Sequence, residues 1–228
     1  RGVDLKLVMA SDLAGGVDGV VAGAGLRGIQ DLRGKRIGIS PLTYSHILVR
    51  SVLARHGLAE SDVVLVPIKG EQVPDALVQG KIDAGHTWGV HIAEACDRGA
   101  SLLFTSAAFP GLLVDSLVVR AEALHQSPEH WRRFIRERER AIEWWRDQPD
   151  DALAALSAAI RLEPSRVSAM LQGVTHFTQH DAAALFDRTA SEPPSLYASG
   201  RLFLEFYRQQ GVIHSEIDLD TILSPLQV

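Results

Sequence analysis

The pattern of apolar and polar positions along the chain changes character near residue 120. Up to that point short apolar runs alternate with stretches of helical spacing, and beyond it helical spacing prevails. The runs predict strands over 3–10, 17–22, 36–40, 62–68, 101–105 and 116–120. The helical stretches predict helices over 43–57, 71–79 and 90–97, then from residue 128 onward and over 150–161, 164–174, 182–187 and 194–210. This order predicts an α/β fold with a mainly parallel sheet and a helical C-terminal part.

The run from Lys35 to Gly57 is the clearest unit of strand, loop and helix. Its second half places apolar residues on one helical face, and Gly57 ends the pattern. The loop 40–46 carries hydroxyl groups and an imidazole where the first N–H groups of a helix are unpaired. Two interpretations stay open: Thr43 or Ser45 caps the helix, or this end also attracts the negative group of a ligand.

Composition and charge exclude several classes of function. With 228 residues, 46% of them hydrophobic, the chain is long enough for a substantial core in one or two domains. The net charge of −5 gives no electrostatic footprint for nucleic acid. Cys96 is the single cysteine, which excludes an internal disulfide framework and a cysteine-based zinc cluster. No H-E-x-x-H spacing supports a metal site either.

The sequence predicts neither a membrane span nor a signal peptide. The longest uncharged run, 99–114, is interrupted by Pro110 and Gly111 and is too short to span a bilayer. The chain opens with a charge and then a strand, a beginning typical of the middle of a domain.

The order of several segments resembles a known family. These segments are RGVDLKLV, GGVDGVVA, IQDLRGKRIGI, LTYSHILVRSVLARHGL, VQGKIDAGHTW and LLVDSLVVR. Together they resemble the extracytoplasmic solute-binding proteins of ABC importers that bind nitrate, alkanesulfonates, taurine and thiamin-pyrimidine precursors. The resemblance implies a bilobed periplasmic-binding-protein type II fold, with mainly parallel sheets flanked by helices.

The resemblance also implies the domain boundaries. Residues 1–23 and 116–228 are expected to form lobe I, and residues 24–115 lobe II. The family has further strands and helices before the segment that RGVDLKLV resembles, so lobe I is expected to lack its N-terminal part here. A further segment or another chain is then expected to complete it.

Family resemblance places a ligand between the lobes, next to the loops at the carboxyl ends of the strands. On the matching positions the implied ligand contacts are Asp12, Asp18, Thr43, Tyr44, Ser45, His46, Trp88, His91 and Asp115. Alternatives remain: Asp18 and Asp115 instead bond to backbone, and Trp88 instead belongs to the core. Asp83 is expected to be a structural turn residue.

The resemblance implies a protein without a cofactor that binds a small polar solute and delivers it to an ABC permease. The solute is expected to be a sulfonate, taurine-like or pyrimidine-type molecule, and the location periplasmic or otherwise extracytoplasmic, free or membrane-anchored. Where the family often has Glu-Pro after the tryptophan, this chain has Gly89 and Val90, which predicts a differently shaped pocket.

Two other classes of function stay open. The same fold can serve as the ligand-sensing domain of a signalling protein. The pyrimidine-synthesising branch of the family is enzymatic and uses a cysteine-rich motif that is missing here. Ser45, His46 and Asp115 are residue types of a hydrolytic set, yet adjacent side chains on a helix point different ways and no G-x-S-x-G turn surrounds a serine. We therefore expect no catalysis.

Overall fold

The computed structural model describes residues 3–226. The chain divides into two compact units, which we describe separately. Unit 1 comprises residues 1–14, 110–168 and 174–228, and unit 2 comprises residues 15–109 and 169–173.

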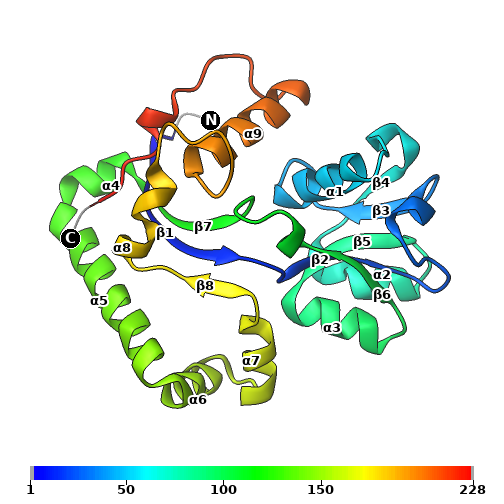
Figure 1. Cartoon of the computed structure of the whole chain (residues 1–228), viewed down its shortest axis with the longest axis horizontal. Coiled ribbons are helices and arrows are strands. Elements are labelled where there is room, and N and C mark those ends of the chain that lie inside the picture. Colours follow the sequence, from blue (N-terminus) through cyan, green and yellow to red (C-terminus); the bar gives the residue numbers. More distant parts are fainter. Residues whose placement is uncertain (1–2, 227–228) are drawn as a thin grey trace. The chain divides into compact units, whose positions relative to one another are not determined.

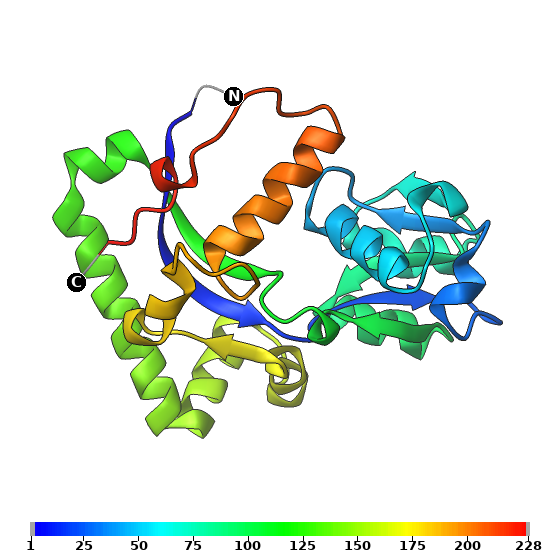
Figure 2. The same cartoon turned by 45° about the horizontal axis from the view of Figure 1, so that its top comes forward.

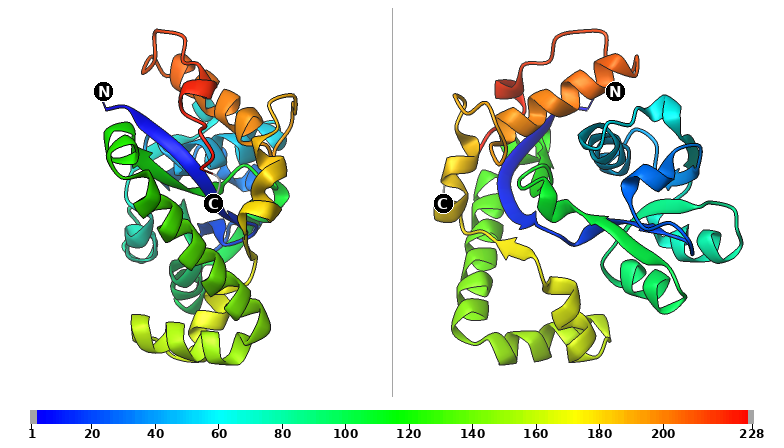
Figure 3. Two further views of the ribbon diagram at one scale, coloured as in Figure 1. Left: turned by 90° about the vertical axis from the view of Figure 1, so that its left-hand side faces the viewer. Right: turned by 45° about the vertical axis from the view of Figure 1, so that its right-hand side comes forward.

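Unit 2 is built on a five-stranded mixed sheet in the order β4-β3-β5-β2-β6. Its strands are β2 (Asp18–Ala22), β3 (Arg36–Ile39), β4 (Val64–Pro67), β5 (Ala84–Trp88) and β6 (Ser101–Thr105). Its helices are α1 (Tyr44–Arg55), α2 (Val73–Val78) and α3 (Gly89–Asp97). Strand β3 runs parallel to β4 and β5, whereas β2 runs antiparallel to β5 and β6. Figure 1 and the right-hand view of Figure 3 show α1 on one face of this sheet and α3 on the other.

Two apolar layers hold the sheet of unit 2 between its helices. Ile37 and Ile39 are fully buried on β3. On the face of α2 and α3, buried residues form a cluster of Val21, Val73, Ala76, Ile82 and Ala95. Gly19 makes close packing possible on that face, because a Cβ there would lie 2.7 Å from Leu102 Cδ1 and 3.1 Å from Ile92 Cδ1. The sheet is therefore covered on both faces, and polar side chains reach solvent mainly at its edges and ends.

Unit 1 contains a three-stranded antiparallel sheet in the order β7-β1-β8. Its strands are β1 (Leu5–Ala14), β7 (Val114–Arg120) and β8 (Val174–His176). Its helices are α4 (Ala121–Gln126), α5 (Pro128–Asp147), α6 (Pro149–Ile160), α7 (Pro164–Leu171, whose end groups with unit 2), α8 (Gln179–Ala182) and α9 (Leu196–Gln209). In Figure 2 the C-terminal segment (red) runs beside β1 (blue), where Leu7 bonds to the backbone of Ile222 and Ser224.

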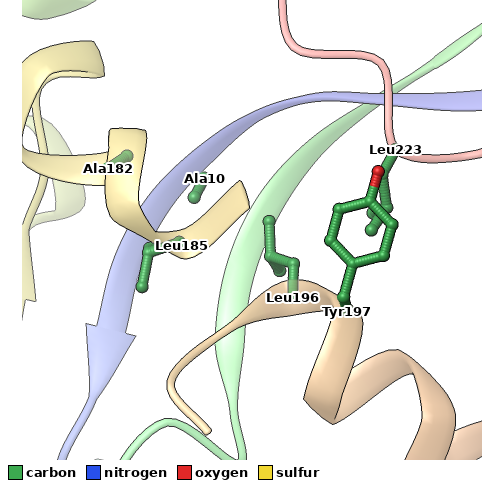
Figure 4. Packing of buried hydrophobic residues seen from close by; sticks show 6 residues of the cluster. All are labelled: Ala10, Ala182, Leu185, Leu196, Tyr197 and Leu223. Carbon is green, nitrogen blue, oxygen red and sulfur yellow. The ribbon is translucent and has the colours of Figure 1, made fainter. Parts of the chain in front are cut away.

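An apolar cluster ties the helices of unit 1 to its sheet. Figure 4 shows its buried members, which come from β1, the segment around α8, the start of α9 and the C-terminal segment: Ala10, Ala182, Leu185, Leu196, Tyr197 and Leu223. Burial of each of the larger side chains in this cluster stabilises the folded state by about 1.5–3 kcal/mol. These contacts join segments that are far apart in the sequence, so the cluster fixes the chain path of unit 1.

The α/β fold class with flanking helices and a helical C-terminal part is confirmed, with corrections in strand direction. The sheets are mixed in unit 2 and antiparallel in unit 1, not mainly parallel. The apolar run at 62–68 predicted a strand covered on both faces, but β4 is an edge strand with exposed Val64. Strand β8 lies in the part predicted to be all helical, where only three residues pair with β1.

The units also divide at other positions than the predicted lobes. The boundaries fall at 14/15 and 109/110, whereas the prediction placed them after residues 23 and 115. The physical reason is the pairing of β2, which bonds to β5 and β6 and therefore belongs to unit 2.

Candidate functional site

The directions of the strands gather polar side chains at one end of the sheet of unit 2. The carboxyl ends of β3, β4 and β5 meet there, and antiparallel β2 begins at the same end with Asp18. Asp18 lies opposite Trp88, the last residue of β5, and Val20 lies opposite His86. Because side chains alternate along a strand, Asp18, His86 and Trp88 share one face. The loop that precedes α1 follows β3 at this end of the sheet.

The start of α1 is closed by its own loop. Thr43 is the N-cap, with extended backbone, and its Oγ1 accepts a hydrogen bond from Ser45 N at 3.2 Å. The Ser45 hydroxyl oxygen accepts from Ser40 N at 3.1 Å. The His46 Nδ1 atom accepts from Leu42 N at 3.4 Å, and Leu42 has a left-handed φ of 58°. The capping interpretation is therefore confirmed for Thr43, and several N–H groups that a ligand would use are already bonded.

Asp18 and His86 form a nearly buried polar pair. Their relative exposures are 6% and 3%, and Asp18 Oδ1 lies 3.2 Å from His86 Nε2. The distance is that of an ion pair, but the ring is not oriented for a hydrogen bond. Within residues 3–226, neither ring nitrogen of His86 has a hydrogen-bond partner. Buried polar groups without partners are uncommon in folded proteins, and one beside a carboxylate is a candidate for ligand recognition.

Trp88 is a large aromatic side chain that remains 40% exposed. Its ring packs directly on Gly70, where a Cβ would lie 2.0 Å from the ring. The neighbouring Thr87 hydroxyl donates to the Gly70 carbonyl oxygen at 2.8 Å, which fixes the backbone under the ring. Only glycine permits this approach, so the contact with Gly70 holds the indole in place.

Four rings, Trp88 among them, form a series of ring contacts, which we call the aromatic ladder: Tyr44, His86, Trp88 and His91. The ring centroids of Tyr44 and His86 are 6.0 Å apart and nearly perpendicular. Those of His86 and Trp88 are 6.3 Å apart, and those of Trp88 and His91 are 5.7 Å apart at 90°. His91 belongs to the first turn of α3, within the helix predicted over 90–97, and its Nδ1 lies 3.6 Å from Glu94 Oε2.

The predicted contact His46 has a different role in the structure. It is 6% exposed, and its Nε2 lies 2.8 Å from Glu60 Oε1 while its Nδ1 accepts from the backbone of Leu42. Both ring nitrogens therefore hold the loop in place. Asp83 accepts from the Arg36 backbone and guanidinium, and these bonds lower the pKa of its carboxyl, in agreement with a structural role.

Asp12 and Asp115 belong to unit 1, whereas the other predicted residues belong to unit 2. They are opposite each other on β1 and β7, and His176 lies opposite Asp12 on β8. Burial lowers the pKa of His176, against the opposing effect of Asp12. The structure thus brings Asp18, Thr43, Tyr44, Ser45, Trp88 and His91 to one end of unit 2 and places two carboxylates in unit 1.

His86 is the residue that sequence reasoning missed. No strand was predicted over 84–88, and it is the observed strand β5 that places His86 on the face of Trp88, two residues further on. Among the described residues, no group of three or more His, Cys, Asp or Glu side chains is arranged to hold a metal ion. No helix in residues 3–226 is long and apolar enough to cross a membrane.

Comparison with solved structures identifies the fold class. The alkanesulfonate-binding protein SsuA from Xanthomonas axonopodis pv. citri, bound to MOPS, superposes with a TM-score of 0.72 at 18% identity, covering 98% of this chain and 75% of that one. The desulfurization enzyme DSZB superposes with a TM-score of 0.66 at 18% identity, covering 97% and 77%. The fold is that of the periplasmic binding proteins, and it is shared by at least one enzyme.

The sequence comparisons place the chain within a family. A family model described as NMT1/THI5 like matches residues 18–152, more than half of the 228 residues, and the chain belongs to this family. A Brucella abortus (strain 2308) protein that is provisionally named a binding protein is 23% identical over 219 residues, which cover 92% of this chain. The chain spans 66% of the length of that relative.

Proposed function

We propose that this chain binds a small polar solute outside the cytoplasm and delivers it to an ABC permease in the membrane. The observation that carries the proposal is the aromatic ladder, with its exposed Trp88 ring beside the buried pair of Asp18 and His86. Aromatic side chains together with a few converging polar groups are typical of the lining of small-ligand sites. The sulfonate-binding structure and the provisionally named binding protein support the same class. We propose a sulfonate, taurine-like or pyrimidine-type solute.

A thermal-shift screen tests this proposal. The probes are taurine, alkanesulfonates, nitrate, thiamin-pyrimidine precursors and simple amines. A ligand at a hundred times its dissociation constant adds about 2.7 kcal/mol of stability. We expect at least one probe to raise the melting temperature, Trp88→Ala to remove the effect, and Trp144→Ala to keep it. Trp144 is a suitable control because it is similarly exposed, at 44% against 40%, and lies on α5 of unit 1. No shift with any probe, or an unchanged shift in Trp88→Ala, would contradict the proposal.

Catalysis is the alternative that the structural match to DSZB raises. Two of the candidate hydrolytic residues have other partners within unit 2: the Ser45 hydroxyl faces Ser40 N, and His46 faces Glu60. We propose that the solute is released unchanged. Recovering a bound solute after long incubation and comparing its NMR spectrum with that of fresh solute checks this, and any new product would favour an enzyme.

A further inference from the structure

Ser106 places a hydroxyl group in the interior of unit 2, directly after the last residue of β6. The residue is 1% exposed, and its Oγ accepts hydrogen bonds from Gly16 N at 2.8 Å and from Asp18 N at 3.4 Å. A serine oxygen can accept two hydrogen bonds, so both of its acceptor positions are in use. Because this oxygen is buried and occupied, Ser106 can influence binding only through the residues that it holds.

The two bonds extend the support of β2 beyond the point where the strands stop pairing. The pairing of β2 with β6 ends at Gly19 and Thr105, because the chain turns into a short 3₁₀ helix at Ser106. From there on the Ser106 side chain provides the acceptor that buried backbone N–H groups require. On the side of β5, Gly89 N donates to Val17 O at 2.9 Å. The backbone that leads into β2 is therefore held on both sides.

The turn that carries Ser106 is itself anchored within unit 2. Phe109 N donates to Ser106 O at 2.9 Å and closes the turn. Arg55, the last residue of α1, donates from Nη1 to Ala108 O at 2.7 Å. Its guanidinium also lies 5.4 Å from the centre of the Phe109 ring. These contacts fix the turn, so the Ser106 oxygen is a rigid support for the segment that it bonds.

The position of the Asp18 carboxylate depends directly on this support. Only two carbon atoms, Cα and Cβ, separate the carboxylate from the backbone nitrogen that Ser106 holds, so a shift of the backbone moves the carboxylate with it. Asp18 is nearly buried, and its Oδ1 lies 3.2 Å from His86 Nε2. Polar groups that are already held in their binding geometry lose little order when a ligand binds, which raises affinity.

We propose that Ser106 is a positioning residue of the solute site. It fixes the backbone of residues 16–18 and thereby places the Asp18 carboxylate, without touching the solute itself. The inference rests on the proposed function and deepens it, because it adds a residue outside the aromatic ladder on which affinity depends. It applies to whichever polar solute the thermal-shift screen identifies.

Three substitutions of Ser106 test the proposal by titration calorimetry with the probe that gives the largest thermal shift. Ser106→Ala removes the acceptor, Ser106→Cys keeps a similar volume but is a weak acceptor, and Ser106→Thr keeps the hydroxyl. We expect the first two to bind the probe about fivefold or more weakly, and Ser106→Thr to stay within about twofold of the wild type. Ser157→Ala is the control and should leave affinity unchanged. Ser157 is also buried, at 4% exposure, and its hydroxyl donates to Leu153 O on α6 of unit 1.

Amide hydrogen exchange followed by NMR separates positioning from a general loss of stability. In Ser106→Ala the amides of Gly16 and Asp18 should exchange about tenfold faster, while those of Val20 and Val21 in the middle of β2 change by less than about threefold. Equal acceleration at all four amides would overturn the inference. This pattern and the affinity of Ser106→Cys decide the question even if Ser106→Thr does not fold.

The design also separates failure of the inference from failure of the proposed function. Wild-type affinity in both Ser106→Ala and Ser106→Cys would overturn the inference and leave solute binding intact. The same holds if a folded Ser106→Thr binds as weakly as Ser106→Ala. A wild-type chain that binds no probe of the screen would instead overturn the proposed function, and the inference with it.

Discussion

The two units use buried polar groups in opposite ways. In unit 1 the half-buried Arg138 donates to the carbonyl oxygens of Ser11 and Phe177, so it joins α5 to the ends of β1 and β8. In unit 2 the more deeply buried His86 has no hydrogen-bond partner among the described residues. Polar groups that are fully bonded within the protein build a fold, whereas those that are buried and unbonded cost stability and are kept for another reason. We therefore expect the buried polar group of unit 2 to serve binding and that of unit 1 to serve stability.

The largest expected effect on stability comes from removing the guanidinium of Arg138. Arg138→Ala removes the arginine donor from Phe177 O and leaves Ser11 O with the bond from Phe177 N alone. We expect a loss of about 3 kcal/mol in the free energy of unfolding. Burial lowers the pKa of this guanidinium, as expected for a group held by the fold. Chemical denaturation followed by circular dichroism measures the effect.

Arg140 supplies the matched control on the same helix. It is 75% exposed and pairs only with Glu137 of α5 in the bonds that the structure records for it. Arg140→Ala should change stability by less than about 0.5 kcal/mol. Equal effects of the two substitutions would show that Arg138 is no more than a surface charge.

The next largest effect is expected at Gly70, against which the Trp88 ring packs. In Gly70→Ala the new Cβ would lie 2.0 Å from the indole, so the ring has to move. We expect a loss of about 2 kcal/mol in stability and at least tenfold weaker binding of any solute found in the screen. Gly28→Ala is the control, because nothing lies within 4 Å of a Cβ at that position. Unchanged affinity in Gly70→Ala would contradict the placement of the solute on Trp88.

A smaller effect follows from the charge of Asp181. Its carboxylate accepts from Thr178 N and then from Arg146, and these bonds lower its pKa from 3.8 to about 2. A carboxyl whose pKa is lower in the folded state stabilises above its unfolded pKa, and this stabilisation is lost as the pH falls through about 2. Since the side chain is one-third exposed, we discount the shift to about 1 kcal/mol.

Asp181→Asn tests this value through its pH dependence. The variant should be less stable than the wild type by about 1 kcal/mol at pH 7, and the difference should shrink between pH 4 and pH 2. Urea unfolding at several pH values measures both. A difference that is the same at pH 7 and at pH 2.5 would mean that the charge plays no part.

The smallest effect separates capping from binding at the start of α1. Thr43→Ala removes the acceptor for Ser45 N, and because Thr43 is exposed we expect a loss of about 0.5 kcal/mol. Affinity for the solute should change by less than threefold, since the cap serves the helix. A large loss of affinity with unchanged stability would instead restore Thr43 as a ligand contact.

Local patterns predicted several elements around the site, but no strand was predicted over 84–88, where β5 carries His86 and Trp88. The helical spacing after residue 43 gave α1 with its N-cap at Thr43, and the start of α9 near 194–196 was also anticipated. Strand β8 was not predictable, because its three residues carry no run of their own and form a strand only by pairing with β1. The exposed edge position of β4 was also not predictable, because an apolar run does not show which strands lie beside it in the sheet.

The sequence predicted the residue types of the candidate site better than it predicted which of these residues lie together. Asp12 and Asp18 are close in sequence, yet the chain leaves one sheet at Ala14 and enters the other at Asp18, so they belong to different units. His46 stands next to Ser45 but turns toward Glu60, a contact that sequence spacing does not reveal. His86 was missed because no strand was predicted over 84–88, so the alternation rule that places it on the face of Trp88 was not applied.

The most direct test of the account observes Trp88 itself during binding. Replacing Trp131, Trp144 and Trp145 by Phe leaves Trp88 as the single tryptophan. Titrating this variant with taurine and with 4-aminopyrimidine should give a saturable change in fluorescence that Asp18→Asn removes. The account would be contradicted if both probes, shown by calorimetry to bind, left the Trp88 emission unchanged, or if Asp18→Asn bound them as tightly as the parent variant.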